Sequence, residues 1–253
     1  MSEGFGYIAG QDEPAHRRVY FEDAIRVSGI GPVDISAYPG RLIALEGTDG
    51  VGRSTQVALL REYLETQGFG VMHTALARSR LAGAGLRRAK QGTTLGQLTL
   101  DLFYATDFAD RLENEILPAL RAGFVVLTDR YVYSVMARSI ARGMSREWLA
   151  DVYRFAPQPH GVLYLRVNAD DLAPRALARG GFDYWESGLD FQEERDVYRS
   201  FMRYQRRLLE VFEELVRTYG FEVVNASQGI ADVFKSLKDA TMRIVGGMKG
   251  ATG

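Results

Sequence analysis

The amino-acid sequence predicts an α/β protein with a five-stranded parallel sheet and helices on both of its faces. Short apolar segments alternate along the chain with longer segments of helical spacing, which is typical of a parallel sheet. A glycine-rich turn joins the first apolar segment to the first helical one, which is the layout of a phosphate-binding loop. Apolar residues make up 46% and charged residues 25% of the chain, as in ordinary globular proteins.

Charge and composition exclude several classes of protein and site. The net charge of −1 over 253 residues argues against a general affinity for nucleic acid or anionic membrane. The chain has no cysteine, so disulfides and thiolate metal sites are excluded. No apolar run reaches the roughly 18 residues of a membrane span, and the first residues lack the order of a signal peptide. We therefore expect a cytoplasmic protein.

The first half of the chain predicts two strands before a long helix. Residues 41–46 and 69–75 are short apolar strands, and the helical segment between them stops at Gly68, a typical C-terminal cap. Residues 1–40 show weak periodicity and are expected to form an N-terminal extension. Residues 82–93 are expected to be a linker with one or two helical turns.

The strongest helical signal in this half runs from residue 94 to residue 123. Pro118 lacks a backbone donor and should bend or break this helix near its end. The apolar residues of the segment step by three and four, as on one face of a helix. They are Leu95, Leu98, Leu102, Ala105, Ala109, Leu112, Ile116 and Leu120.

The second half predicts the remaining strands and helices of one domain over residues 41–246. Strands are expected at residues 124–128, 161–167 and 221–226. Helices are expected within 129–143 and 145–156, over 191–218, and through Val233, Leu237 and Ile244. The glycine-rich tail at residues 247–253 is expected to be disordered.

The turn after the first strand, EGTDGVGRST, has the features of an anion site. Gly47, Gly50 and Gly52 let the backbone turn tightly and bring its N–H groups close to a phosphate. The helix that follows adds its positive end, and Ser54 offers a hydroxyl to Mg²⁺. Arg53 stands where the pattern G-x-x-x-x-G-K-[ST] has lysine. The predicted phosphate-binding residues are Gly47, Thr48, Asp49, Gly50, Val51, Gly52, Arg53, Ser54 and Thr55.

Asp129 and Arg130 follow the strand at 124–128, and ligands of parallel sheets bind at the carboxyl ends of strands. A carboxylate there can hold Mg²⁺ or its bound water, so Ser54 and Asp129 are the predicted metal ligands. Arg130 can grip a phosphate through two hydrogen bonds. The alternative is a surface salt bridge, and taken alone the Asp-Arg pair is weak evidence for a phosphate site.

Residues 176–190 are predicted to form a lid. Arg175 and Arg179 lie one helical turn apart and point to one side, and the glycines that follow permit movement. Such a lid closes arginines over the transferring phosphates and excludes water. The alternative is a solvated basic helix face with a loop.

In their order and spacing these pieces resemble the thymidylate kinase family of P-loop nucleoside monophosphate kinases. The similarity extends from Arg41 to about Val245. The matching segments are EGTDGVGRSTQ, LFYATDFADRLENEILPALRAGFVVLTDRY, PQPHGVLYLRV and RALARGGFDYWESGLD. The resemblance implies a P-loop kinase fold, ATP with Mg²⁺ as phosphate donor, and dTMP as acceptor.

The resemblance also implies roles for individual residues. The lid arginines would assist catalysis, because Gly50 stands where some members carry an arginine inside the loop. The predicted catalytic residues are Arg53, Asp129, Arg175 and Arg179. The predicted acceptor-binding residues are Asp49, Tyr104, Phe108, Arg130 and Arg138.

Several positions depart from the family pattern. Tyr104 stands where an aromatic residue stacks on thymine, and Phe108 stands where an arginine reads the base edge. These two residues lie four apart on one helix, so we expect them to line an aromatic slot for the base. The family's arginine-bearing segment after the second strand has no clear match, and Arg78 or Arg80 is expected to substitute for its arginine.

The sequence therefore favours an ATP-dependent kinase of dTMP that acts on small-molecule nucleotides, expected to be a homodimer. Two alternatives stay open. Arg53 and residues 1–40 favour a non-catalytic or regulatory nucleotide-binding member of the family. The altered base-reading positions favour a kinase with another nucleoside monophosphate, or another small molecule, as acceptor.

Overall fold

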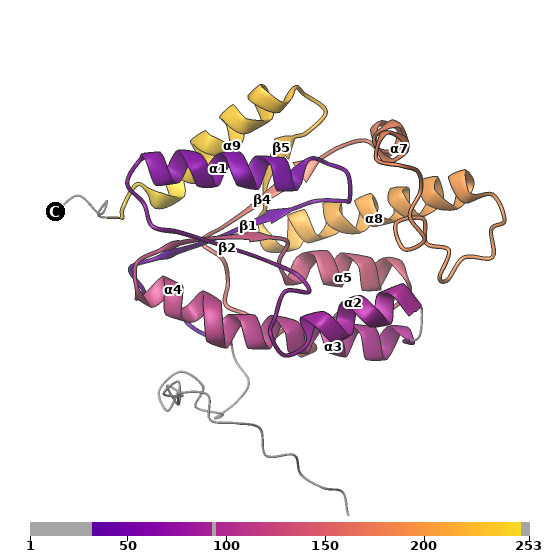
Figure 1. Ribbon diagram of the computed structural model, residues 1–253, viewed down its shortest axis with the longest axis horizontal. Helices are drawn as coiled ribbons and strands as arrows, with labels where there is room; N and C mark the ends of the chain where they lie inside the picture. The colour runs from indigo at the N-terminus through magenta and orange to yellow at the C-terminus, as the bar shows by residue number, and fades with distance from the viewer. Residues whose placement is uncertain (1–31, 93–94, 249–253) are drawn as a thin grey trace, which may run out of the picture.

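Five parallel strands form the central sheet of the computed structural model, which describes residues 32–92 and 95–248 (Figure 1). Their order across the sheet is β2-β3-β1-β4-β5, so the predicted five-stranded parallel core is confirmed. The strands are β1 (Arg41–Glu46), β2 (Val71–Ala75), β3 (Val125–Asp129), β4 (Gly161–Arg166) and β5 (Glu222–Asn225). Among the described residues, no helix combines the length and the apolar run that a membrane crossing requires.

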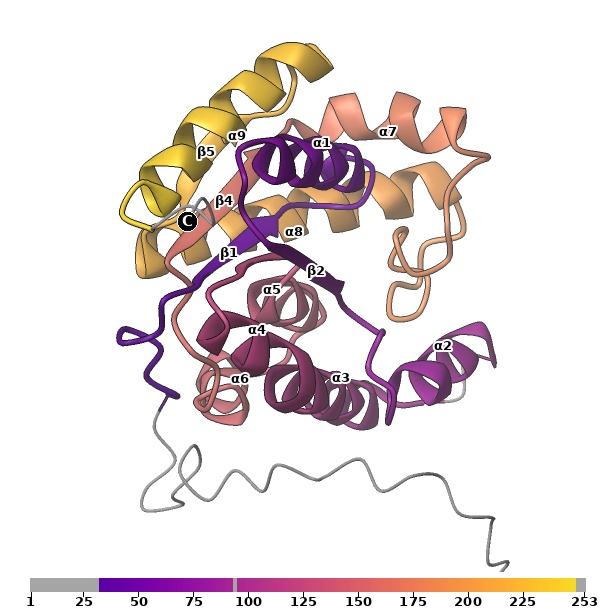
Figure 2. The same cartoon turned by 60° about the vertical axis from the view of Figure 1, so that its left-hand side comes forward.

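Helices cover both faces of the sheet (Figures 1 and 2). On one face α1 and α9 pack together over the sheet, and on the other lie α3, α4 and α5, with α8 against α5. The helical elements are α1 (Arg53–Thr66), α2 (Gly83–Gly92), α3 (Gln97–Arg111), η1 (Leu112–Ile116), α4 (Leu117–Arg121), α5 (Val132–Ala141), α6 (Arg146–Val152), α7 (Ala169–Ala178), α8 (Val197–Tyr219) and α9 (Ile230–Val245).

The long helix predicted over residues 94–123 is interrupted, as Pro118 led us to expect. It consists of α3, a single π-helical segment and the short helix α4. In a regular helix the ring of Pro118 would clash with the carbonyl of Asn114. The wider π-helical turn before it relieves this clash.

The π-helical segment also changes which side of α3 is buried. Leu98 and Leu102 were expected on the same face as Leu112, yet they are 54% and 45% exposed. An extra residue in one turn rotates the preceding helix by roughly 100° about its axis. The buried face of α3 therefore carries Asp107 and Phe108 in place of the two leucines.

The helix predicted over residues 191–218 begins later, at Val197. The Asp196 side chain caps it by accepting a hydrogen bond from the Arg199 backbone N–H at 3.1 Å. Its end is set by Gly220, which adopts the left-handed conformation with φ of 68°. Phe191 lies outside the helix and is exposed, and the buried apolar side chains of α8 start with Phe201.

The end of the predicted N-terminal extension is part of the folded domain. Ile35 is buried in the same core as β1 and α4, and the Val33 backbone N–H donates to the Phe155 carbonyl at 3.2 Å. Residues 1–31 of the predicted extension and residues 249–253 of the predicted tail lie outside the described residues.

Candidate active site

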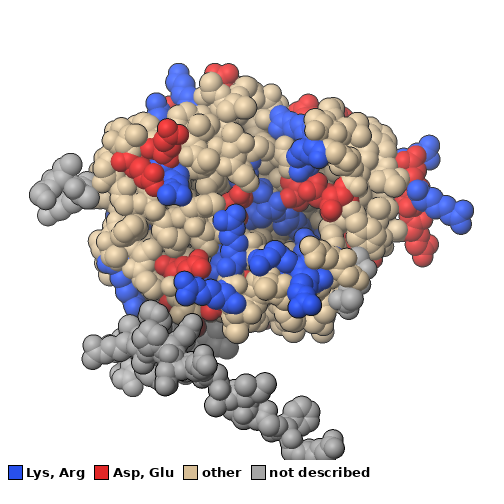
Figure 3. All heavy atoms as spheres, in the orientation of Figure 1, with Lys and Arg blue, Asp and Glu red and all other residues tan. Residues whose placement is uncertain are grey.

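The central strands β1 and β3 are neighbours, and their carboxyl ends lie side by side at one end of the sheet. Their register places Leu45 opposite Asp129. The helices that follow them, α1 and α5, leave toward opposite faces of the sheet, so a crevice remains between the two strand ends. Figure 3 shows a recess in the molecule where acidic and basic side chains gather.

The loop after β1 has the backbone of an anion-binding turn. Gly50 and Gly52 lie in the left-handed region, with φ of 77° and 94°, which glycine adopts without strain. Helix α1 begins immediately afterwards, and no side chain caps its N-terminus. The backbone N–H groups of its first turn are therefore directed toward the loop, where they can donate hydrogen bonds to a phosphate.

Arg53 turns back into this loop instead of away from it. Its side chain is 6% exposed, and its Nη1 donates to the carbonyls of Gly47 at 2.7 Å and Thr48 at 3.2 Å. Its Nε forms an ion pair with Asp129. The guanidinium thus links the loop's own backbone to the end of β3.

Asp129 is held between Arg53 and Ser54. The Ser54 hydroxyl donates to Asp129 Oδ2 at 2.8 Å, while Arg53 binds Oδ1. Burial raises the pKa of Asp129, but the Arg53 charge and these hydrogen bonds outweigh it and hold the pKa below its usual value. The carboxylate is therefore ionised at neutral pH.

Ser54 and Asp129 fit a magnesium site that is completed by phosphate. A hydroxyl and an ionised carboxylate are the oxygen ligands that Mg²⁺ prefers, and they already lie within hydrogen-bond distance of each other. Within residues 32–92 and 95–248, no group of three or more His, Cys, Asp or Glu side chains is placed to hold a metal ion. Nucleotide phosphates and water would supply the remaining ligands.

The two predicted lid arginines both reach the loop. Arg175 donates to the Val51 carbonyl at 3.4 Å and to the Ala226 carbonyl at 3.0 Å. Arg179 lies directly over Gly50, because a Cβ at this glycine would stand 2.8 Å from Arg179 Nη2. Arg179 therefore occupies space that any side chain at position 50 would take.

A cavity of about 380 Å³ adjoins the loop and contains most of the predicted acceptor-binding residues. At one side, Asp49 accepts hydrogen bonds from Arg130 and, at 2.6 Å, from Arg138. Arg130 has φ of 77°, a conformation that costs a non-glycine residue on the order of 1 kcal/mol. The carboxylate thus holds two guanidinium groups together beside the loop, where they can bind a phosphate.

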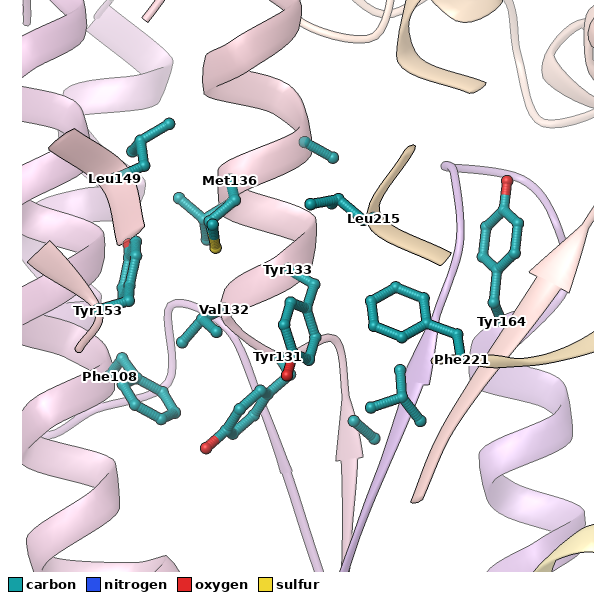
Figure 4. Packing of buried hydrophobic residues seen from close by; sticks show 14 of the residues in the cluster. Phe108, Tyr131, Val132, Tyr133, Met136, Leu149, Tyr153, Tyr164, Leu215 and Phe221 are labelled. Atoms are coloured by element: carbon teal, nitrogen blue, oxygen red, sulfur yellow. The ribbon is translucent and has the colours of Figure 1, made fainter. Parts of the chain in front are cut away.

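Tyr104 lines this cavity but Phe108 does not. Phe108 is 1% exposed and packs edge-on against Tyr131, with ring centroids 4.9 Å apart. Figure 4 shows it among the buried residues, with Tyr153 nearby. The predicted aromatic slot is wrong in this respect, because Phe108 packs into the core against Tyr131 and Tyr153 while Tyr104 lines the cavity.

Several cavity residues were missed in the sequence. Arg78 and Arg80 are exposed, and Arg87 of α2 lines the cavity instead. The sequence predicts a linker with one or two helical turns over residues 82–93, and α2 occupies most of this range. Gln97 and Asp101 of α3 also line the cavity. They were missed because the π-helical segment rotates α3 about its axis and so changes which of its residues face the cavity.

Arg142 ties the lid segment to the rest of the domain, a role the sequence did not reveal. It binds Asp190, with its Nε 2.7 Å from Oδ2, and donates to the Trp185 carbonyl at 3.0 Å and to the Tyr204 hydroxyl. The Trp185 indole in turn donates to the Lys90 carbonyl of α2 at 3.1 Å. The lid loop between α7 and α8 thus reaches α2 across the cavity (Figure 2).

Comparison with known proteins shows the family of the chain. The family model described as Thymidylate kinase matches residues 45–237. The chain is 34% identical over 196 residues to a protein named "Probable thymidylate kinase 2" from Saccharolobus solfataricus, with 77% of this chain and 92% of that relative covered. It is 32% identical over 204 residues to proteins named "Probable thymidylate kinase" from Pyrococcus abyssi and Pyrococcus horikoshii, with 78% of this chain and 94% of each relative covered. The chain belongs to the thymidylate kinase family.

Proposed function

We propose that the protein is an ATP-dependent kinase that transfers the γ-phosphate of ATP to dTMP and gives dTDP. The observation that carries the proposal is the convergence of three features at one sheet edge. These are the glycine loop, the Ser54–Asp129 pair and a lid arginine, Arg179, above Gly50. Family membership and the names of the relatives support the choice of substrate.

The residues divide the work of binding and transfer between them. Residues 47–55 bind the ATP phosphates, and Ser54 with Asp129 would hold Mg²⁺, which supplies charge neutralisation when bound. Arg130 and Arg138 hold the acceptor phosphate while Asp49 keeps them in place. An oxygen of that phosphate forms the new bond to the γ-phosphorus, and the bond to the β–γ bridging oxygen breaks.

The lid arginines stabilise the charge that develops on the transferring group. Arg179 lies over Gly50 and Arg175 donates to the loop carbonyl of Val51, so both cations stand beside the loop that binds the phosphates. ADP leaves with the electron pair of the broken bond. Because little covalent chemistry is left to the protein, positioning and electrostatics provide most of the acceleration.

Arg53 favours a second candidate function, a nucleotide-binding protein without phosphoryl transfer. Its guanidinium is buried against Asp129 and the loop carbonyls. To contact the β- and γ-phosphates it has to leave these partners. A chain in which this rearrangement does not occur would bind nucleotide but transfer phosphate slowly or not at all.

We further propose a homodimer that forms through α3. Leu98 and Leu102 are exposed one turn apart on this helix, so they offer an apolar surface that a second copy of the chain can cover.

An ADP-release assay over a panel of nucleoside monophosphates tests the proposed activity. The expected result is Mg²⁺-dependent ADP release that requires an acceptor and is fastest with dTMP. Nucleotide binding without ADP release from any acceptor would favour the second candidate function.

A further inference from the structure

Helix α3 places the buried carboxylate of Asp101 in the wall of the cavity beside the loop, where the acceptor nucleotide is proposed to bind. Gln97, Asp101 and Tyr104 line the cavity together, because residues three and four apart share one side of a helix. Asp101 is 1% exposed, and carboxylates this deeply buried are rare unless a partner compensates them.

Only one oxygen of this carboxylate has partners in the protein. Asp101 Oδ1 accepts hydrogen bonds from the Ser139 hydroxyl at 2.5 Å and from Gln97 Nε2 at 2.8 Å. Oδ2 is buried and accepts none from the described residues. Burial raises the pKa of Asp101, although the two hydrogen bonds oppose this rise. A buried oxygen without a donor is costly, so a ligand that supplies an N–H would stabilise the site.

In the family pattern, the residue four positions after Tyr104 is an arginine that donates hydrogen bonds to the base. Helix α3 lacks this donor. Phe108 stands there and is packed in the core against Tyr131, so it cannot contact a base. The cavity wall that α3 provides therefore presents a hydrogen-bond acceptor instead of a guanidinium.

We infer that Asp101 reads the base of the acceptor nucleotide by accepting a hydrogen bond from a ring N–H. The inference rests on the proposed kinase function. Thymine and uracil carry such a donor at N3 and guanine carries one at N1. Cytosine and adenine have a lone pair at the corresponding ring atom, which the carboxylate repels. Asp101 thus selects the acceptor base by charge and donor pattern.

The test compares dTMP, N3-methyl-dTMP and dCMP as acceptors for the wild type and for Asp101→Asn. The wild type should use dTMP well, and it should reject both the methylated analogue and dCMP. In Asp101→Asn, kcat/KM for dTMP should fall by about tenfold to a hundredfold, the usual effect of losing a hydrogen bond to a charged group. The preference for dTMP over dCMP should shrink further, since an amide can donate to cytosine N3.

A matched control is Asp151→Asn, which neutralises an exposed aspartate on α6 and should leave all acceptors unchanged. If Asp101→Asn lowers kcat/KM for all three acceptors equally, Asp101 only stabilises the contact between α3 and Ser139. The inference is then wrong, while the kinase function stands. Equal use of dTMP and N3-methyl-dTMP by the wild type also overturns it, whether or not the variant folds.

Failure of the proposed function gives a different result. A wild type that releases no ADP with any monophosphate is not the proposed kinase. Calorimetric titration of dTMP and N3-methyl-dTMP into the wild type then decides the role of Asp101. Tighter binding of dTMP supports it, and equal affinity or no binding by either ligand contradicts it.

Discussion

At the scale of single residues, Arg53 most clearly separates this loop from one that carries lysine. Its planar fork reaches Asp129 and two loop carbonyls at once, whereas an ammonium is a compact point charge. In the proposed mechanism the guanidinium keeps the positive charge that the phosphates require, but it has to exchange Asp129 for them. We therefore expect a working site whose chemistry is slower than that of a lysine loop.

Substitution of Arg53 tests this account. Arg53→Lys should keep or raise turnover, because the rest of the loop has the geometry of a lysine loop. Arg53→Ala should weaken Mg²⁺–ATP binding by roughly 1.5–3 kcal/mol through the loss of a charge-assisted contact. It also leaves Asp129 without its cation, and breaking a buried ion pair costs about 3 to 5 kcal/mol in the free energy of unfolding.

Calorimetric titration of Mg²⁺–ATP and urea unfolding measure the two quantities. Arg154→Ala, at an exposed arginine in the turn after α6, is the matched control for removing a guanidinium. Unchanged ATP affinity in Arg53→Ala would mean that the guanidinium never reaches the phosphates.

Arg179 is the lid residue that lies over Gly50 of the loop. Arg179→Ala should lower turnover by on the order of a thousandfold, because it removes charge stabilisation of the transition state. The dissociation constant for ATP should change much less. Steady-state kinetics and nucleotide titration separate the two effects, and near-normal turnover would remove Arg179 from the mechanism.

At the scale of elements, the joint between β1 and α5 depends on one buried carboxyl group. Glu46, the last residue of β1, accepts hydrogen bonds from the backbone N–H groups of Tyr131 at 2.8 Å and Ser134 at 3.2 Å. Burial raises its pKa from 4.5 to about 7, although the hydrogen bonds from Ser134 and Tyr131 oppose this. The carboxyl group thus caps the start of the helix that carries Arg138.

This raised pKa predicts a pH dependence of stability. The folded protein binds the Glu46 proton more tightly than the unfolded chain does, so the stabilisation is complete below pH 4.5 and is lost as the pH rises through about 7. The loss is roughly 3 kcal/mol. Glu46→Gln cannot ionise, so its free energy of unfolding should fall less than that of the wild type between about pH 5 and about pH 7.5.

Urea unfolding at the two pH values measures the difference. Glu210→Gln, at an exposed glutamate on α8, should follow the wild type. Parallel curves for the wild type and Glu46→Gln would show that the group titrates normally in the folded protein.

The proposed dimer surface on the exposed side of α3 can be tested by substitution. Leu98→Glu combined with Leu102→Glu places two charges on the proposed dimer surface, and buried unpaired charges oppose association. We expect the wild type to elute as a dimer and the double variant as a monomer in size-exclusion chromatography with light scattering. Ile230→Glu, at an exposed isoleucine that begins α9, is the control and should remain dimeric. A monomeric wild type contradicts the proposal.

At the scale of the whole molecule, the parts that depend on local sequence were predictable. The five strands have short-range apolar patterns, and the glycines of the loop require the left-handed conformations that Gly50 and Gly52 adopt. The interruption before Pro118 also follows from the chemistry of one residue. Each of these features is set within a few residues of the chain.

The parts that depend on long-range packing were not predictable. The direction of Arg53 is decided by the register that places Asp129 beside the end of β1. Helix α3 buries the side that carries Phe108 and exposes Leu98 and Leu102. This follows from the rotation that the π-helical segment introduces, which no pattern of residues predicts. Asp101 reaches the cavity only through that same phase change, and its hydrogen bond with Ser139 joins α3 to α5.

In the proposed reaction, the loop, the Ser54–Asp129 pair and the lid arginines together transfer a phosphate to dTMP. The most direct test incubates the protein with γ-labelled ATP, Mg²⁺ and dTMP and follows the label. We predict labelled dTDP from the wild type, none when Mg²⁺ is removed by chelation, and formation slower by on the order of a thousandfold in Arg179→Ala. Binding of ATP without labelled product, from dTMP or from any other nucleoside monophosphate, would contradict the claim.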